Sequence, residues 1–318
     1  MKALVTGHNG FVGRHMVAEL EQRGYDVDGV DLAAGARPQY GKVWRFQRDV
    51  RDFFRSSEER SYDLVVHLAA VVGGRQMIEG QPLAVAVDLA LDAEMFQWAL
   101  RTRPGRVVYF SSSAAYPVGL QQATRQASVP DGKVLRMVEK PNDRRLIESD
   151  IEFGMIGAPD LTYGWSKLTG ELLAQHAEAE GLRVQVFRPF SGYGTDQDPA
   201  YPFRAFVDRA TSRADPFDIW GDGEQTRDWI HIDDVVAGTL AAVEQDVAGP
   251  INICTGRATS FNELAKLVTS EAGYSPAFRH LPAMPSGVHY RVGDPTKLFS
   301  FYQPKVSLEE GIRRALEA

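Results

Sequence analysis

The sequence predicts an α/β fold, in which a doubly wound parallel sheet is accompanied by a smaller C-terminal lobe. Short apolar runs alternate with helical patterns over the first half of the chain, as is typical of a parallel sheet with helices on both faces. From Pro189 to Trp229 glycine, proline, aspartate and aromatic residues dominate instead, which indicates longer loops. The 318 residues are sufficient for two lobes around buried cores.

Each expected element rests on its hydrophobic pattern. Apolar runs predict strands, and amphipathic spacing predicts helices. The strands are expected at Ala3–Thr6, Val27–Asp31, Leu64–Leu68, Val107–Ser111 and Val184–Phe187, and the helices at Phe11–Arg23, Leu83–Arg101 and Tyr163–Glu180. A helix at Asp233–Gln245 and a strand at Ile251–Cys254 are expected to return to the main sheet. Ser260 begins a further helix, with Glu263 completing a capping box. The mixed segment Pro117–Pro159 fits no simple pattern, and its length suggests a lid over the functional site.

The composition argues against several classes of protein. The net charge is −7 and no basic run is present, so we expect neither nucleic acid nor a membrane surface as a partner. The longest strongly apolar stretch, Leu64–Val72, is far too short to span a bilayer. The single cysteine, Cys254, allows no intrachain disulfide. Because the chain runs from Met1 directly into a glycine motif, it leaves no room for a signal peptide, and we expect a cytoplasmic protein.

The glycine motif predicts a Rossmann-type dinucleotide site. Gly7 allows a tight turn after the first strand, Gly10 lets the backbone approach a pyrophosphate, and Gly13 permits close packing of helix on strand. Asp31 ends the second strand 18 residues after Gly13, close to the spacing of the acid that binds the adenosine ribose. A carboxylate there would repel a 2′-phosphate, which favours NAD over NADP, although the nearby Arg37 leaves NADP open.

A second acid follows a third candidate strand. Asp49 could contact the adenine edge there, or it could simply cap a helix. Residues 1–190, with 229–256 returning, are accordingly expected to form the NAD-binding domain. Residues 191–228 and 257–318 are expected to form the substrate-binding lobe. We expect no metal site.

Tyr163 and Lys167 stand four residues apart on an expected helix and therefore share a face. The ammonium and the positive nicotinamide should both lower the pKa of the phenol, which makes Tyr163 a candidate base. Ser112, or else Ser113, lies at the end of a strand facing the cofactor crevice and could bond the reacting oxygen. Taken alone, the pair is more typical of a surface tyrosine and lysine, and the serines fit a turn.

Together these residues resemble the extended short-chain dehydrogenase/reductase family, in its NAD-dependent nucleotide-sugar epimerase/dehydratase branch. The matching motifs, in chain order, are Thr6-Gly7-x-x-Gly10-x-x-Gly13, His67-Leu68-Ala69-Ala70, Ser112-x-x-x-Tyr116, Tyr163-x-x-x-Lys167, Arg188-Pro189-Phe190-Ser191-Gly192-Tyr193-Gly194, Gly221 to Asp228, Asn252 to Gly256, and Arg291 with Asp294. The resemblance implies NAD as cofactor and a nucleotide-diphosphate sugar as substrate. It also implies a homodimer formed through the helices at Leu83–Arg101 and Tyr163–Glu180.

The resemblance completes the expected site. The cofactor residues are Gly7, Asn9, Gly10, Phe11, Val12, Gly13, Asp31, Asp49, Val50, Leu68, Ala69, Ala70 and Lys167. The substrate residues are Gly74, Arg75, Ser112, Ser191, Trp220, Arg227 and Arg291, and the catalytic ones are Tyr163, Lys167, Ser112 and Ser113. Arg227 and Arg291 would neutralise the diphosphate with bidentate bonds. Trp220 or Phe217 would stack on the base, unless either is an ordinary core aromatic.

Residues that differ from the motifs of this branch limit the reactions that can be expected. Ser113-Ala114 stand where the dehydratases have Asp-Glu, and the uronate decarboxylases usually have Glu at the Ala114 position. Several segments are similar to GDP-mannose 3,5-epimerases, but Ala114 replaces their proton-shuttling Cys and the partner Lys is missing from Thr195–Tyr201. We therefore expect epimerisation at C4 through a 4-keto intermediate. Arg75 stands near an Arg of the uronate 4-epimerases, so a sugar carboxylate remains open, although a solvated loop residue fits Arg75 at least as well.

Two further departures and three alternatives remain. Ser191 replaces the usual Asn, and Asp88 stands where the family commonly has Asn in a helix. The alternatives are a nucleotide-sugar reductase or dehydrogenase, a 3,5-epimerase with an acid/base group other than Cys, and, outside enzymes, an NAD-sensing regulator. Such regulators often lack the Tyr-Lys pair, which is present here.

Overall fold

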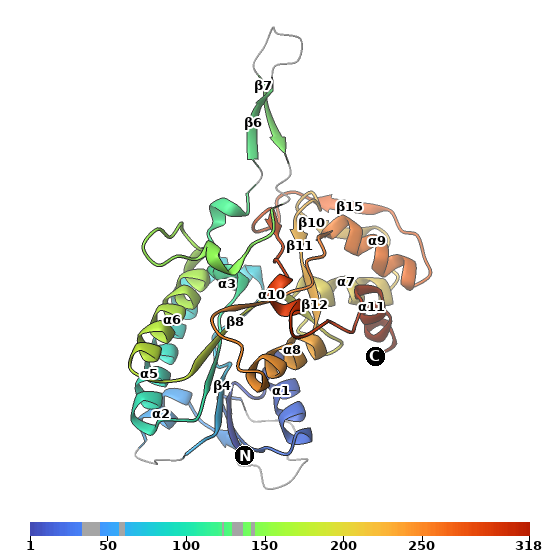
Figure 1. Ribbon diagram of the computed structural model, residues 1–318. Coiled ribbons are helices and arrows are strands. Elements are labelled where there is room, and N and C mark those ends of the chain that lie inside the picture. The colour runs from blue at the N-terminus through green and yellow to red at the C-terminus, as the bar shows by residue number, and fades with distance from the viewer. Residues whose placement is uncertain (34–44, 57–60, 123, 129–135, 141–143) are drawn as a thin grey trace.

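The structure is a computed structural model that describes residues 1–33, 45–56, 61–122, 124–128, 136–140 and 144–318. Its main body is a seven-stranded parallel sheet in the order β13-β8-β5-β4-β1-β2-β3 (Figure 1). In chain order these strands are β1 (Lys2–Thr6), β2 (Asp26–Asp31), β3 (Arg45–Gln47), β4 (Leu64–His67), β5 (Val107–Phe110), β8 (Val184–Pro189) and β13 (Ile251–Ile253). The strand order reverses between β1 and β4, and a crevice at such a reversal is where open α/β sheets bind ligands.

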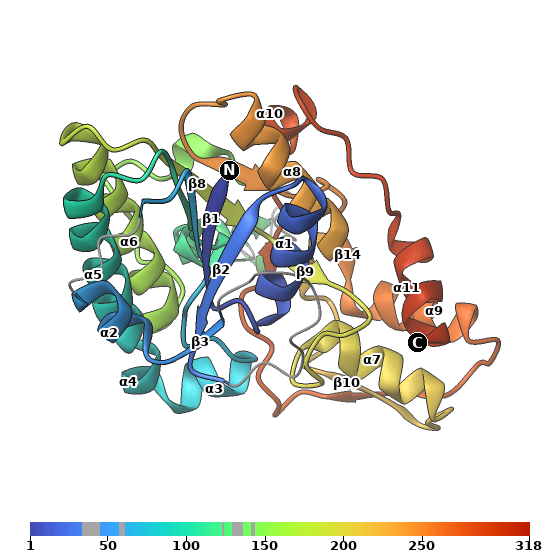
Figure 2. The same ribbon diagram turned by 90° about the horizontal axis from the view of Figure 1, so that it is seen from below.

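Helices cover both faces of this sheet (Figure 2). One face packs against α1 (Phe11–Gln22) and α8 (Ile232–Glu244), and the other against α2 (Val50–Arg55), α5 (Val87–Thr102) and α6 (Leu161–Ala179). Because both faces are buried, the central strands are continuous apolar runs rather than alternating ones.

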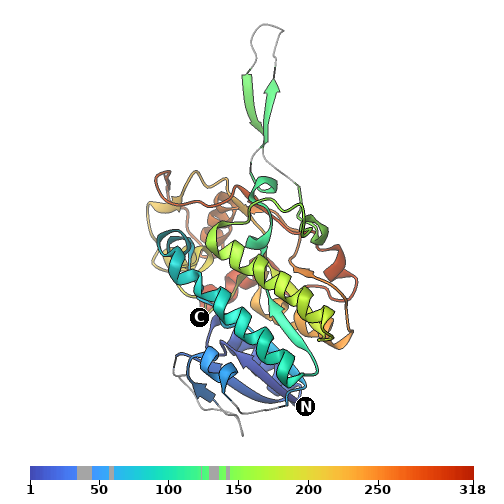
Figure 3. The same ribbon diagram turned by 90° about the vertical axis from the view of Figure 1, so that its left-hand side faces the viewer.

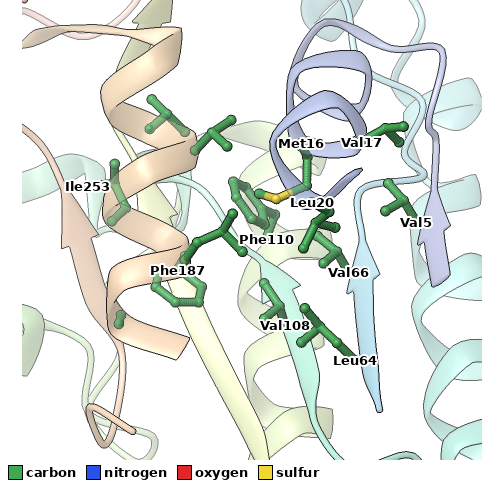
Figure 4. Close-up of a cluster of buried hydrophobic side chains, with 14 of the residues drawn as sticks. Val5, Met16, Val17, Leu20, Leu64, Val66, Val108, Phe110, Phe187 and Ile253 are labelled. Atoms are coloured by element: carbon green, nitrogen blue, oxygen red, sulfur yellow. The ribbon is translucent and has the colours of Figure 1, made fainter. Parts of the chain in front are cut away.

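Two apolar clusters fill the space between sheet and helices. On the α1 and α8 side, Met16 and Leu20 of α1 meet Val66 of β4 and Phe187 of β8 (Figure 4). On the opposite side the cluster is rich in aromatic residues, with Phe54, Trp98 and Tyr109 all less than 3% exposed. Burial of this kind stabilises a fold by about 25 cal/mol per Å² of apolar surface.

The second lobe has its own core and small sheets. Its helices are α7 (Pro202–Thr211), α9 (Phe261–Glu271) and α11 (Leu308–Glu317). Its strand pairings are β10 (Phe217–Trp220) with β15 (Phe278–Leu281), β9 (Ser191–Tyr193) with β12 (Trp229–His231), and β11 (Thr226–Arg227) between β14 (Thr259–Ser260) and β16 (Tyr290–Arg291). Phe203, Phe206, Phe217, Leu264 and Ile312 are buried together between these elements.

The predicted fold class and all the predicted strands and helices are confirmed, and their ends agree with the predicted ones to within two residues. The helix expected at Leu83–Arg101 is divided into α4 (Pro82–Val85) and α5. Ser260 caps α9 as expected, its hydroxyl accepting from the N–H of Glu263 at 3.1 Å. Helix α7 was not predicted, because its apolar stripe lies in a stretch dominated by turn-forming residues. None of the helices in the described part of the chain is long and apolar enough to cross a membrane.

The segment proposed as a lid forms an antiparallel pair, β6 (Thr124–Ser128) with β7 (Arg136–Lys140). The two strands stand out from the body instead of lying against it (Figures 1 and 3). The described part of this hairpin therefore does not cover the site, and the lid interpretation is wrong for these strands. Three further short α-helices are α3 (Arg75–Gly80), α4 and α10 (Thr296–Phe299).

Candidate functional site

One large cavity of about 1620 Å³ opens at the carboxyl ends of the parallel strands and runs toward the second lobe. A single drug-sized ligand needs roughly 300–1,000 Å³, so this cavity has room for two ligands side by side. The residues expected at the site that line it are Gly7, Asn9, Gly10, Phe11, Val12, Asp31, Asp49, Val50, Leu68, Ala69, Ala70, Gly74, Arg75, Ser112, Tyr163, Lys167, Ser191, Trp220, Arg227 and Arg291. The structure thus brings together residues from the whole length of the chain.

The glycine turn forms one end of the cavity and fits a pyrophosphate. Gly7 has φ +67°, a left-handed conformation that favours glycine, and a Cβ there would lie 2.9 Å from the backbone of Leu68 and Ala69. A Cβ at Gly13 would lie 2.1 Å from the carbonyl oxygen of Gly7, so only glycine allows α1 to pack this closely on β1. Helix α1 begins with no side-chain cap, which leaves its first N–H groups and positive dipole end available to an anion.

Asp31 is held at the end of β2 beside this turn. Its carboxylate accepts hydrogen bonds from the backbone N–H of Asn9 at 2.9 Å and of Ala33 at 3.0 Å. These bonds fix a negative charge where an adenosine ribose would lie if the pyrophosphate were bound by the turn. The geometry therefore fits NAD. Arg37, which left NADP open, lies outside the described residues.

Asp49 performs the capping role considered as the alternative to adenine contact. Its carboxylate caps α2 by accepting from the N–H of Arg51 at 2.8 Å, and it also forms an ion pair with the Arg51 guanidinium. The side-chain hydrogen bond from Arg51 lowers the pKa of Asp49. A contact with the cofactor remains a prediction for Asp49 and its neighbour Val50.

Helix α6 presents Tyr163 and Lys167 to the middle of the cavity, one turn apart. The Nζ atom of Lys167 lies 6.0 Å from the centroid of the Tyr163 ring and 5.5 Å from that of Tyr109. Ser112, just after β5, also lines the cavity, whereas Ser113 is buried and is not among the lining residues. The geometry therefore favours Ser112 over Ser113 as the hydroxyl beside the phenol.

Burial changes the electrostatics expected of this pair. It raises the pKa of Tyr163, and Lys167 and Ser112 only partly offset the effect. The lowered pKa expected from the sequence is therefore not found for these side chains by themselves, because spacing along a helix does not reveal how deeply the phenol is buried. Burial lowers the pKa of Lys167, but Asp92, Tyr163 and Asp88 outweigh it, so the pKa is raised and the ammonium is retained.

A buried polar network below the pair escaped the sequence analysis. Nδ1 of His67 lies 2.8 Å from the Thr6 hydroxyl, and its Nε2 lies 3.2 Å from Asp92, which also accepts from the Tyr109 hydroxyl at 2.6 Å. The Thr6 hydroxyl accepts from the backbone of Leu68 and so ties the ends of β1 and β4 together. The one indication in the sequence is a histidine within an otherwise apolar strand.

Asp88 adds a second buried carboxylate near Lys167. One oxygen accepts from the N–H of Val71 at 2.6 Å, and the residue is 1% exposed. Burial raises the pKa of Asp88 to about 6, although Lys167 and the Val71 bond lower it. Because the folded state holds this proton more tightly than the unfolded chain, the ionised group destabilises the fold, and the destabilisation appears as pH rises from about 4 through this pKa.

We therefore expect Asp88→Asn to raise the free energy of unfolding at pH 7.5 by about 1–3 kcal/mol, since an amide keeps the Val71 bond without the charge. The gain should shrink as pH falls and approach zero below about pH 4, where the Asp88 carboxyl is protonated in the folded state and increasingly so in the unfolded chain. Urea unfolding at several pH values measures it, with the exposed Asp26→Asn as a control that should leave stability unchanged. A gain of equal size at every pH would contradict the assignment.

The far end of the cavity is cationic. Arg227 and Arg291 lie opposite each other on the paired strands β11 and β16, and Arg75 begins α3 nearby. Arg227 donates to the carbonyl oxygens of Thr226 at 2.8 Å and Ser286 at 3.1 Å. Burial and the neighbouring Arg291 lower the pKa of Arg227 to about 9. Like charges gathered in a buried site indicate an anionic ligand, as expected for a diphosphate.

Asp160 is the site residue that the sequence analysis missed. Its carboxylate accepts from Arg75 at 2.9 Å and from Arg291 at 2.8 Å. Burial raises the pKa of Asp160, but the two arginines outweigh it and the net shift is downward. As an acid directly before a helix it resembles an ordinary cap, yet its side chain makes no cap bond to α6.

Of the remaining residues expected to bind the substrate, some line the cavity and one is buried in the core. Trp220 is half-buried and lines the cavity, so it can reach a base, whereas Phe217 is fully buried in the second lobe. Gly74 and Ser191 line the cavity, and the N–H of Ser191 donates to the carbonyl oxygen of Asp228 at 2.9 Å. Within the described residues, no group of three or more His, Cys, Asp and Glu side chains could hold a metal ion.

Comparison with known proteins places this arrangement in a family. GDP-mannose 3,5-epimerase 1 of Oryza sativa subsp. indica is 27% identical over 98% of this chain and 80% of its own length. The dTDP-4-dehydro-6-deoxy-D-allose reductase of Streptomyces bikiniensis is 30% identical over 93% of this chain and 88% of its own. The structure of Thermus thermophilus UDP-glucose 4-epimerase in complex with NAD matches with a TM-score of 0.76 at 25% identity, covering 100% of this chain and 98% of that one.

The family model agrees with these relatives and with the geometry of the glycine turn and Asp31. It matches residues 3–254, from the first strand to the end of β13, which is more than half of the chain. The protein therefore belongs to the NAD dependent epimerase/dehydratase family, and NAD is its cofactor.

Proposed function

We propose that this protein epimerises a nucleotide-diphosphate sugar at C4 through a 4-keto intermediate, with Tyr163 as the base. The observation that supports this most is that three groups of residues line one and the same cavity. These are the glycine turn, Tyr163 with Ser112, and the paired Arg227 and Arg291. A sugar whose diphosphate is bound by the two arginines would extend toward the phenol.

The proposed mechanism assigns one task to each side chain. Tyr163 takes the proton of the C4 hydroxyl, while Ser112 bonds the same oxygen and holds it toward the phenol. Lys167 stabilises the phenolate, since its buried ammonium lies on the same helix face. NAD, held by the glycine turn and Asp31, supplies the hydride acceptor and donor when bound. Turning the keto sugar over before the hydride returns to its other face would invert C4.

The surroundings of Ala114 argue against the other reactions of the family. Ala114 is 4% exposed and has no group that could move a proton at C3, C5 or C6. Cys254 does not replace the missing thiol, because it is buried among apolar side chains and its pKa is raised well above the usual value. Asp160 lies near Ala114, but a carboxylate whose pKa is lowered by two arginines is a poor proton acceptor.

A second candidate is a nucleotide-sugar reductase that exchanges its cofactor. The 30% identical reductase of Streptomyces bikiniensis favours it. The two functions differ in stoichiometry, since a reductase consumes reduced cofactor and an epimerase does not. A 3,5-epimerase with an acid/base group other than Cys is a further alternative. The NAD-sensing regulator is disfavoured by the presence of Tyr163 and Lys167 in the cavity.

We further propose the division into lobes given above, 1–190 with 229–256 for NAD and 191–228 with 257–318 for the sugar nucleotide, and a homodimer. Leu89 on α5 is 40% exposed and Trp165 on the neighbouring α6 is 50% exposed, so these helices carry two large apolar side chains that a second copy of the chain could cover. Light scattering on wild-type protein and on Leu89→Glu/Trp165→Glu tests the dimer. A monomeric wild-type protein would exclude it.

The test of the reaction uses the purified protein with a panel of GDP-, UDP-, CDP- and dTDP-sugars, uronates included, in heavy water. NMR of the products should find one substrate inverted at C4, with no deuterium on carbon and no net NADH. Deuterium at C3 or C5 would refute C4 epimerisation and favour a 3,5-epimerase. Stoichiometric oxidation of added NADH would favour the reductase.

A further inference from the structure

The cationic end of the cavity contains a carboxylate of its own. Asp160 Oδ1 and Oδ2 both lie 2.9 Å from Nη1 of Arg75, and Oδ2 also lies 2.8 Å from Nη2 of Arg291. The Asp160 side chain is 8% exposed. Two of the three arginines gathered here are therefore paired within the chain.

The third arginine differs from these two. Arg227 donates to two backbone carbonyl oxygens, and no ion pair with a carboxylate is found for it among the described residues. It stands close to the other two, since a Cβ placed on Gly287 would lie 3.2 Å from its Nη2 and 3.6 Å from Cζ of Arg75. Among these cavity-lining residues, Arg75, Arg227, Arg291 and Asp160 carry a formal charge of +2, that is, three positive charges and one negative; Glu79, which also pairs with Arg75, does not line the cavity and is left out of this sum.

This net charge of +2 balances the charge of a diphosphate and leaves no positive charge to balance a further anion. A sugar nucleotide diester carries about two negative charges at neutral pH, and a uronate carboxylate would bring a third. In a buried site an uncompensated charge is strongly disfavoured. Arg75, the residue that left a sugar carboxylate open, already donates through Nη1 to both carboxylate oxygens of Asp160.

We propose that Asp160 is a specificity-determining residue, because it occupies the position on Arg75 that a sugar carboxylate would otherwise take. This inference rests on the function proposed above. The substrate class is thereby restricted to nucleotide-diphosphate sugars with a neutral sugar. Asp160 also holds the guanidinium groups of Arg75 and Arg291 in the orientation from which they face the cavity.

The backbone fixes Asp160 in this position. Its N–H donates to the carbonyl oxygen of Ala114 at 3.0 Å, and its own carbonyl oxygen accepts from the N–H of Gly164 at 2.8 Å. Leu161 follows with φ +54°, a left-handed conformation that is uncommon for leucine. The chain thus turns sharply between the carboxylate that faces the arginines and Tyr163, which α6 presents to the same cavity.

The test is calorimetric binding to the NAD-loaded protein, with matched pairs of ligands. UDP-glucose is compared with UDP-glucuronate, and GDP-mannose with GDP-mannuronate. Wild-type protein is expected to bind the neutral member of the better pair at least roughly ten-fold more tightly. Asp160→Asn should shift that ratio toward the uronate by roughly ten- to a hundred-fold, because it frees a charged hydrogen-bonding partner on Arg75.

Two further variants make the result specific. Asp160→Glu keeps the charge and should keep the preference for the neutral sugar, even if it binds both members more weakly. Glu79→Gln is the matched control, since Glu79 also pairs with Arg75, at 2.5 Å, but is not among the residues lining the cavity. Its ratio should stay within about three-fold of wild type.

The possible outcomes distinguish the proposed role of Asp160 from the proposed C4 epimerisation. An unchanged ratio in Asp160→Asn, or a wild-type preference for the uronate, would overturn the role of Asp160. If no neutral or uronate sugar of the GDP, UDP, CDP and dTDP panel bound to wild-type protein, both this role and the proposed substrate class would fall. A shifted ratio without any C4 inversion would support the role of Asp160 while refuting the proposed reaction. Because the wild-type preference is itself a test, the proposal stays falsifiable even if Asp160→Asn does not fold.

Discussion

Tyr163→Phe is expected to lower kcat by roughly a thousand-fold while leaving the bound NAD and the fold intact. The change removes one hydroxyl from a buried ring, so the packing of α6 against the sheet is retained. It also removes the only group in the proposed mechanism that takes the proton of the C4 hydroxyl. Turnover of the substrate identified by NMR, together with the absorbance of bound NAD, measures both effects.

Lys167→Met is the companion to this variant. Since burial raises the pKa of Tyr163 and Lys167 opposes that shift, removing the ammonium should raise the pKa further. The fraction of phenolate grows with pH, so kcat of the wild-type protein should rise with pH and the rise should move to higher pH in Lys167→Met.

Retention of more than about a tenth of kcat in Tyr163→Phe would show that another group is the base.

Arg188→Ala is expected to destabilise the protein by about 3–5 kcal/mol. The guanidinium of Arg188, on β8, donates to Glu171 of α6 at 2.9 and 2.7 Å, and the two side chains are only 2% and 3% exposed. It also donates to the Tyr116 hydroxyl at 3.0 Å. Removing it would leave the Glu171 carboxylate buried without its cation, which is far more costly than losing a surface pair.

The double variant Arg188→Met/Glu171→Met separates the cost of the orphaned charge from the cost of lost packing. It should recover much of the stability, because replacing both members of a buried pair with apolar residues is often close to neutral. Urea unfolding of the two single variants and the double variant gives the interaction energy as a cycle. A double variant as unstable as Arg188→Ala would show that packing, and not charge, dominates at this position.

Local patterns account for the parts of this protein that were predicted from sequence. Turn, strand and helix around Gly7 and Gly13 are contiguous, so three glycines and the following acid are sufficient to define them. Tyr163 and Lys167 share a helix, and their relative placement follows from four residues of spacing. In each case the residues that must meet are close in the chain.

What was missed depends on contacts between distant segments. Asp160 meets Arg291 across 131 positions of sequence, and no local pattern distinguishes such an acid from a helix cap. Whether Phe217 stacked on a base or filled a core could not be decided, because a strand of four residues does not reveal what lies on each face. The depth of burial that raises the pKa of Tyr163 is likewise set by the packing of the whole molecule.

The last strand of the main sheet has a consequence for dissecting this protein. Strand β13 pairs with β8 through Ile251 with Phe187 and Ile253 with Pro189, after the chain has already entered the second lobe. A fragment ending near residue 190 would therefore expose the row of unpaired N–H and C=O groups along β8, an edge that invites aggregation. The two lobes are interleaved along the chain and cannot be separated by a single cut, so neither should be expected to behave as an independent module in expression or evolution.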